Sequence, residues 1–271
     1  MLGKLIKYEF KACARYFVPL YVAIVSIFLI NGFTISDGSG NIFTGIMIAL
    51  LIAIIAIFIF VNLYVTIKRF SISIFGDEGY LSNTLPVSPF TLMSSKAITM
   101  LIYTFISILV FIVAVLLFAA PNISKIDMFN LQEAFSGMIL EANKLNLNMP
   151  LLIFQIVIGI IISTISSILV LYLSVSVAHL RQCINHKYIY GFLTYFAFNI
   201  SSSVLSNFLF KDMSTSFESK QFAADQGGQF LVEMTSFMQS VMLKSNLLSV
   251  VYILIAGGLV VYIMSRKLNL E

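Results

Sequence analysis

Charged residues are scarce in this sequence of 271 residues: they make up 10% of the chain, while hydrophobic residues make up 59%. A soluble domain carries about 25% charged residues, so most of this protein's surface faces something other than water. No stretch is rich in proline, glycine and serine, and no internal repeat is visible. We therefore expect one membrane domain over residues 1–271, divided loosely into two halves of three spans each.

Six long apolar runs contain no Asp, Glu, Lys or Arg. A helix of about 20 residues crosses a hydrocarbon core of about 30 Å. Inside a bilayer the backbone must satisfy its own hydrogen bonds, so each run is expected to be a helix. We predict an all-α membrane protein with six transmembrane helices, at residues 17–34, 42–67, 97–120, 151–178, 188–210 and 247–264.

Basic residues are distributed unevenly between the connections. Eleven of the 16 lie on one side of the predicted spans, together with only four of the 12 acidic residues. The side rich in lysine and arginine is normally cytoplasmic. This predicts a multi-pass protein of the cell membrane with both termini in the cytoplasm and outer loops at 121–150 and 211–246. The net charge of +4 then needs no nucleic-acid partner to explain it.

Groups that perform chemistry are also few. Cys13 and Cys183 both fall on the predicted cytoplasmic side, where thiols stay reduced, so no disulfide is expected. His179 and His186 could share a helix face in a metal site, but we interpret them as ordinary interfacial residues, and we expect no metal site. The phosphate-binding signature G-x-x-x-x-G-K-[ST] and the common catalytic motifs are absent. We predict no enzyme activity and no cofactor in this chain.

The predicted spans contain only neutral polar groups. Transporters driven by ion gradients usually hold ionisable residues within their spans, so this class is disfavoured. Two interpretations remain for the serine- and threonine-rich part of the fourth span: close helix packing, or a polar stripe along a substrate path. The residues concerned are Ser163, Thr164, Ser166 and Ser167.

Residues 2–17 have the pattern of a basic amphipathic helix. Their apolar side chains fall on one side of a helical wheel, and four basic residues fall on the other: Lys4, Lys7, Lys11 and Arg15. Such a helix is expected to lie on the inner leaflet. Glu9 interrupts the apolar side. Either its carboxylate snorkels from the helix rim, or it pairs with a base such as Lys68 or Arg69.

The connection between the second and third spans carries turn and helix signals. Gly76 and Gly79 bracket an acidic pair that suits a helix N-terminus, so a short helix is predicted near Asp77–Leu85, closed by Pro86. Ser88 and Pro89 form a suitable N-cap and first-turn pair, and a helix should run from there into the third span. Three side chains should project apolar surface from this connection: Phe75, Tyr80 and Leu81.

Two of these segments carry a resemblance. The start KYEFKACARYFVPLY and the loop FGDEGYLSNTLPVSP resemble permease subunits of ATP-binding-cassette (ABC) exporters of the second type, especially small six-span peptide-exporter permeases of Gram-positive bacteria. The resemblance implies that the loop is a coupling helix that docks on a separate ABC ATPase, which would bind ATP and Mg²⁺. It also implies a dimer of permeases. The coupling residues would be Phe75, Gly76, Asp77, Glu78, Gly79, Tyr80 and Leu81.

The second outer loop offers an apolar stripe after a Gly227–Gly228 break. A methionine-rich face either packs against neighbouring helices or adapts to varied apolar ligands. The candidate substrate-contacting residues are Met234, Phe237, Met238 and Met242. The first outer loop carries a similar helical spacing, with the apolar residues Phe135, Met138, Ile139, Ala142 and Leu145.

Together these observations favour a permease that exports hydrophobic or amphipathic peptides, antimicrobial or toxic ones by the resemblance, with energy from a partner ATPase. Two alternatives stay open. The chain could be a permease for lipids or drugs, or a membrane immunity or scaffold protein that transports nothing.

The topology gives the first testable prediction. Cysteines introduced at Asp127 and Asp225 should react with membrane-impermeant thiol reagents in whole cells, whereas the native Cys183 should not. The reason is the asymmetry of basic residues, which places both aspartates outside. Labelling of Cys183 in intact cells would contradict the six-span arrangement.

Overall fold

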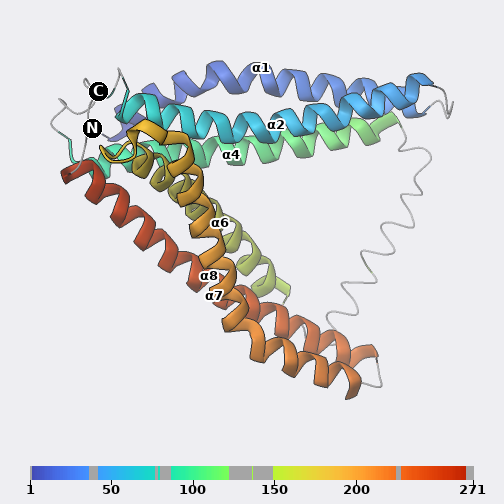
Figure 1. Ribbon diagram of the computed structural model, residues 1–271. Coiled ribbons are helices and arrows are strands. Elements are labelled where there is room, and N and C mark those ends of the chain that lie inside the picture. The colour runs from blue at the N-terminus through green and yellow to red at the C-terminus, as the bar shows by residue number, and fades with distance from the viewer. Residues whose placement is uncertain are drawn as a thin grey trace. The chain divides into compact units, whose positions relative to one another are not determined.

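The computed structural model describes residues 2–36, 42–76, 79, 87–121, 136, 149–223 and 227–266. The chain divides into two compact units, one formed by Met1–Met128 with Met264–Glu271 and the other by Phe129–Ile263. All the long elements in the described part of the chain are α-helices, and no β-strand occurs there (Figure 1). Each unit is built around three long helices, as the predicted halves would be.

The first unit contains α1 (Leu2–Ser36), α2 (Ile42–Ile74) and α4 (Pro89–Ala119), which run side by side with α2 antiparallel to the other two (Figure 1). Helix α1 packs most extensively against α4 and also packs against α2. A buried cluster joins the three helices through Leu20, Ile24, Phe28, Ile54 and Ala114. Helix α1 is therefore the central element of this unit.

The predicted amphipathic segment and the first span form one continuous helix. Helix α1 passes through Pro19 without ending, although proline cannot donate a backbone hydrogen bond. Its four basic residues near the N-terminus are exposed, while Cys13 and Phe17 on the opposite side are buried. Leu2 and Phe10 on the predicted apolar side are exposed, so the division into two faces is seen only in part. The segment is continuous with the first span, because α1 passes through Pro19.

Helix α4 begins where the sequence predicts. Ser88 is the N-cap in an extended conformation, and its hydroxyl oxygen accepts a bond of 3.3 Å from the backbone N–H of Thr91. Pro89 occupies the first helical position, where its missing N–H would have no partner in any case. The helix then continues without interruption through the predicted third span.

The second unit contains α6 (Met149–Ala178), the short 3-10 helix η2 (Ile184–His186), α7 (Lys187–Ala223) and α8 (Gly227–Arg266). Helices α6 and α7 pack against each other. Helix α8 begins at the predicted glycine break, but the outer amphipathic segment and the last span form one helix rather than two. The predicted apolar spacing between Phe135 and Leu145 lies largely outside the described residues.

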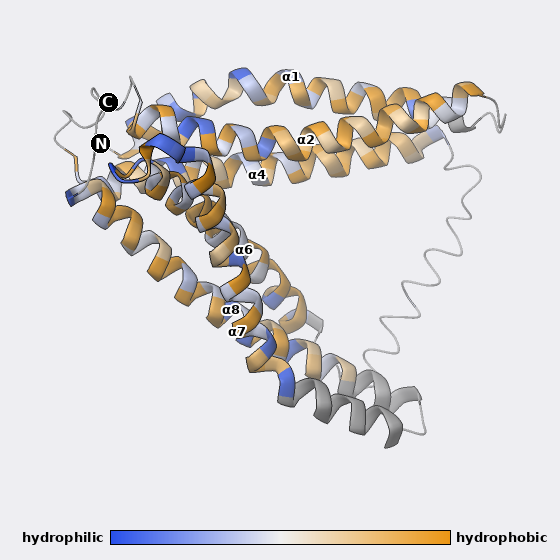
Figure 2. Cartoon of the chain, in the orientation of Figure 1, coloured by the Kyte–Doolittle hydropathy of each residue, from blue (hydrophilic) through white to orange (hydrophobic). Residues whose placement is uncertain are grey.

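Five described helices, α1, α2, α4, α6 and α8, are long and apolar enough to cross a membrane. Hydrophobic residues predominate along these helices (Figure 2), and many large apolar side chains point outward. This is the pattern of a multi-pass membrane protein. Helix α7 is not among the five, although residues 188–210 carry no charge, because Asn199 and several serines reduce its hydropathy. The predicted count of six spans is thus not confirmed.

A close helix crossing in the first unit gives the second prediction. A Cβ atom on Gly32 would lie 2.6 Å from the carbonyl oxygen of Phe118, so α1 and α4 approach here in a way that only glycine permits. Gly32→Ala should lower the thermal midpoint of the purified protein, since overpacking costs about 1–3 kcal/mol. Gly45→Ala is the matched control, because nothing lies within 4 Å of its added methyl group. Equal midpoints for the two variants would refute the close crossing.

Candidate functional site

A buried charge cluster joins the three helices of the first unit. Its centre is the carboxylate of Glu9 on α1, which accepts a bond of 3.2 Å from Arg69 Nη2 and one of 3.4 Å from Ser73 Oγ, both on α2. Lys96 Nζ on α4 donates to the same carboxylate and to Ser73 Oγ. The side chains of Glu9 and Arg69 are 14% exposed and that of Lys96 is 6% exposed. We refer to these four residues as the charge cluster.

The charge cluster decides between the two interpretations of Glu9. The predicted ion pair with Arg69 is confirmed, and the snorkelling interpretation is wrong because the carboxylate is turned inward to two cations. The alternative base, Lys68, lies instead over the rings of Tyr16 and Tyr64, with its ammonium 5.6 Å and 5.1 Å from their centroids. Lys96 was not predicted as a partner of Glu9, because its position in the sequence does not show that it faces α1.

Aromatic packing fixes α1 on α4 beside the charge cluster. The Tyr103 ring stacks on Phe10 and on Phe17, with centroid distances of 4.6 Å in each case. The Tyr103 hydroxyl also donates a bond of 2.8 Å to the backbone carbonyl of Phe10. These contacts set the register between the two helices, so the Glu9 carboxylate is held at the level of Lys96.

The predicted coupling loop leaves α2 directly after the charge cluster. Phe75 is buried, with 4% of its surface exposed, and its ring contacts that of Phe70. The prediction that Phe75 projects apolar surface is therefore wrong: the side chain completes the packing at the end of α2. Gly76 follows it at the start of the turn, and Asp77, Glu78, Tyr80 and Leu81 lie outside the described residues.

Position 79 requires glycine because it lies very close to the backbone of Ile74, and not because of an unusual backbone dihedral angle. Its N–H donates a bond of 2.7 Å to the carbonyl of Gly76. An added Cβ would lie 2.3 Å from the backbone oxygen of Ile74, and φ is outside the left-handed region. Gly79 thus lies tightly against the end of α2.

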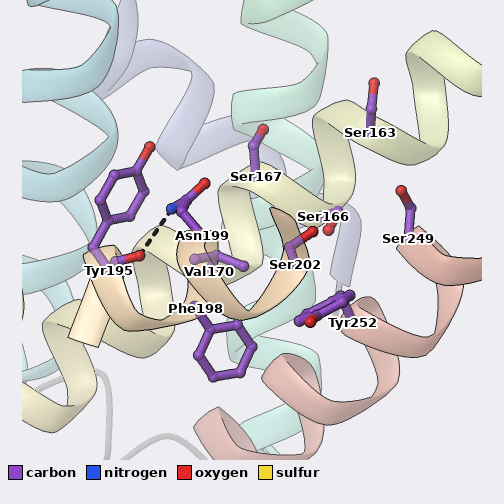
Figure 3. Close-up of a pocket in the computed structure, with 10 residues that line it drawn as sticks. All are labelled: Ser163, Ser166, Ser167, Val170, Tyr195, Phe198, Asn199, Ser202, Ser249 and Tyr252. Atoms are coloured by element: carbon purple, nitrogen blue, oxygen red, sulfur yellow. Dashed lines mark hydrogen bonds between the residues drawn. The ribbon is translucent and has the colours of Figure 1, made fainter. Parts of the chain in front are cut away.

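A half-open cavity of about 150 Å³, lined by small polar and aromatic side chains, lies among the three helices of the second unit (Figure 3). We refer to it as the polar cavity for its serine and asparagine groups. Side chains from each helix line it, and none of them is charged. Helix α6 contributes Ser163, Ser166, Ser167 and Val170; α7 contributes Tyr195, Phe198, Asn199 and Ser202; α8 contributes Ser249 and Tyr252. The predicted polar stripe therefore faces a cavity through three of its four members, while Thr164 does not line it.

Several polar groups around this cavity bond to their own helices. Ser163 Oγ donates a bond of 3.1 Å to the carbonyl of Ile160, and Ser167 Oγ donates one of 2.8 Å to the carbonyl of Thr164. Asn199 Nδ2 donates a bond of 2.8 Å to the carbonyl of Tyr195 (Figure 3). The lining residues of α7 and α8 were not predicted, although Asn199 and Ser202 have the i, i+3 spacing of one helix face.

Of the methionine stripe, Met234 and Met238 are 39% and 40% exposed, and Phe237 and Met242 are half-buried. Substrate contact there stays a prediction. Both cysteines are free, as predicted. The described residues contain no cluster of three His, Cys, Asp or Glu side chains. His179 follows the end of α6 and His186 ends η2, so the two histidines do not share a helix. The His179 ring forms a hydrogen bond of 2.8 Å with the carbonyl of Val175.

No protein-family model, curated protein or solved structure matches this chain. The likeness to exporter permeases is carried by the two short motifs alone.

The charge cluster gives the third prediction. Glu9→Gln should destabilise the first unit by about 3–5 kcal/mol, because it leaves two buried cations without their shared anion. Thermal unfolding of the purified protein measures the effect, and Lys7→Gln, which alters an exposed charge on the same helix, is the control. The double variant Glu9→Gln with Lys96→Met should recover part of the loss, since one cation is removed with the anion. A single variant as stable as the wild type would contradict the structural role of Glu9.

Proposed function

We propose that this chain is the membrane-spanning permease subunit of an ABC exporter. The observation that carries the proposal is the position of the charge cluster. Arg69 and Ser73 lie within two turns of the end of α2, and Lys96 lies two turns after the start of α4, so the cluster braces both helices that flank the loop 75–88. A loop that receives force from a partner needs such a rigid base, because a compliant one would absorb the motion.

The partner in this proposal is a separate ATPase that binds ATP and Mg²⁺, since the sequence holds no phosphate-binding motif of its own. The loop residues Glu78 and Tyr80 would contact it. A second copy of the permease would complete the transporter. Helix α7 would be the sixth span: it is 37 residues long, and its polar face would be covered within the assembly rather than by lipid. Both termini would then be cytoplasmic.

The substrate class in this proposal is a hydrophobic or amphipathic peptide. The spans offer no charged residue to neutralise a highly charged small molecule. The neutral polar cavity and the exposed methionines Met234 and Met238 suit a ligand with both polar and apolar faces. A lipid or drug also has polar and apolar faces, whereas a scaffold would need neither the cavity nor the methionines. The test must therefore distinguish peptide export, lipid or drug efflux, and a scaffold role.

The fourth prediction concerns ATP turnover by the permease reconstituted with its ATPase in proteoliposomes. Amphipathic helical peptides should raise turnover, and scrambled peptides of the same composition, in which no apolar helix face can form, should raise it less. Equal stimulation by both, or by phospholipid alone, would favour lipid efflux. No stimulation by any of them would favour a scaffold.

Glu78→Ala tests whether the loop couples the permease to the ATPase. The variant should insert normally but lose most of the stimulated turnover, because a charge-assisted contact to the ATPase contributes about 1.5–3 kcal/mol. Lys4→Ala, which removes a charge from the exposed face of α1, should retain it. Full stimulation of the Glu78 variant would overturn the assignment of this loop to coupling.

A further inference from the structure

The polar cavity of the second unit presents hydrogen-bond acceptors. Ser163, Ser167 and Asn199 each donate a hydrogen to a carbonyl of their own helix. A serine oxygen that has donated its only hydrogen still has lone pairs, and an asparagine keeps its carbonyl oxygen. These three side chains, on two helices, therefore offer oxygen acceptors to a ligand.

Aromatic rings form a second part of the lining. Tyr195, Phe198 and Tyr252 border the same cavity (Figure 3). The face of an aromatic ring attracts a cation. The rings and the oxygen lone pairs thus favour positive charge in the same small volume.

The lining also excludes other ligand classes. An anion would meet hydroxyl donors but no basic side chain to balance its charge. A divalent metal ion is held in proteins by carboxylate, imidazole or thiolate ligands, and the lining contains no Asp, Glu, His or Cys. A cavity of about 150 Å³ is large enough for a molecule the size of benzene, so it accepts more than a single ion.

We propose that this cavity binds the primary ammonium group of an amphipathic ligand. The N–H groups of the ammonium donate to the oxygens of Ser167 and Asn199, which lie next to each other in Figure 3, and the aromatic rings of the lining favour its charge. Two sources share this chemistry: a lysine side chain or N-terminus of a peptide, and the headgroup of an aminophospholipid. The site does not depend on the proposed ABC function, because binding requires neither an ATPase nor transport.

The test uses the purified full-length chain in nanodiscs of phosphatidylcholine, with empty nanodiscs as background. Equilibrium dialysis measures the binding of n-hexylammonium, n-hexanol and hexyltrimethylammonium, which have the same hydrocarbon chain. Hexylammonium should bind at least about tenfold more tightly than either of the others, since the alcohol lacks the charge and the trimethyl compound lacks N–H donors. Equal binding of the three probes would overturn the proposal.

Two substitutions locate the site. Ser167→Ala and Asn199→Leu each remove an acceptor from the cavity, and each should weaken hexylammonium binding about tenfold. Thr164→Val and Thr194→Val are matched controls on the same two helices, because their hydroxyls bond to backbone carbonyls and do not line the cavity. If the Ser167 and Asn199 variants keep their thermal midpoint and bind like the wild type, these side chains only pack and the proposal fails. If Asn199→Leu does not fold, Ser167→Ala alone tests the proposal, because it removes only one hydroxyl group.

Competition separates the two sources of the ammonium group. Nanodiscs that contain phosphatidylethanolamine should reduce hexylammonium binding if the lipid headgroup occupies the cavity. A lysine-containing amphipathic peptide should compete, and its acetyl-lysine form should not, if the peptide is the ligand. Failure of both competitors to displace a hexylammonium molecule that depends on Ser167 and Asn199 would restrict the site to small free amines.

Discussion

The Glu9 carboxylate is the interaction on which the first unit depends. It bonds to a cation on each of the two neighbouring helices, so it fixes the rotation of α1 relative to α2 and α4 at the same time. Apolar contacts alone would allow these helices to slide, because nearly every face of α2 and α4 is hydrophobic. A buried ion pair costs desolvation energy but specifies one register, and here the register places the ends of α2 and α4 beside the same loop.

The sequence was most informative where a local rule was broken or a cap was required. Glu9 on an apolar helix face indicated either a snorkelling carboxylate or an ion pair, and the structure shows the pair with Arg69. Ser88 followed by Pro89 fixed the start of α4. Local rules failed where tertiary contacts decide the outcome: Phe75 follows a helix in a polar connection, yet it is buried by contacts that no local pattern reveals. Pro19 falls within the predicted first span, and α1 continues through it toward the N-terminus.

The polar cavity was only partly predictable for a related reason. In a water-soluble helix, the polar face marks the outside, and periodicity gives the rotation of the helix. In a membrane helix both the lipid-facing side and the core-facing side are apolar. The periodicity of hydrophobic residues therefore says little about which face of the helix points to the core. The serines of α6 could be recognised as unusual, but their meeting with Asn199 on α7 and Tyr252 on α8 required coordinates. The signal that was available is the i, i+3 spacing of polar residues on α7, read together with the serines of α6.

The location of the charge cluster also has a consequence for the bilayer itself. Four hydrogen-bonded polar groups cannot enter hydrocarbon without cost, so in a bilayer we expect the cluster to lie at the boundary of the hydrocarbon core. From Arg69 to the start of α2, and from Glu9 to the end of α1, the helices extend about 40 Å at 1.5 Å per residue. A typical hydrocarbon core is about 30 Å thick, so these helices are longer than an upright crossing needs. In a bilayer the bundle must therefore tilt, thicken the lipid around it, or protrude on the far side. A change in membrane thickness would then change the tilt or the protrusion of α1, whose N-terminal part is fixed by the charge cluster.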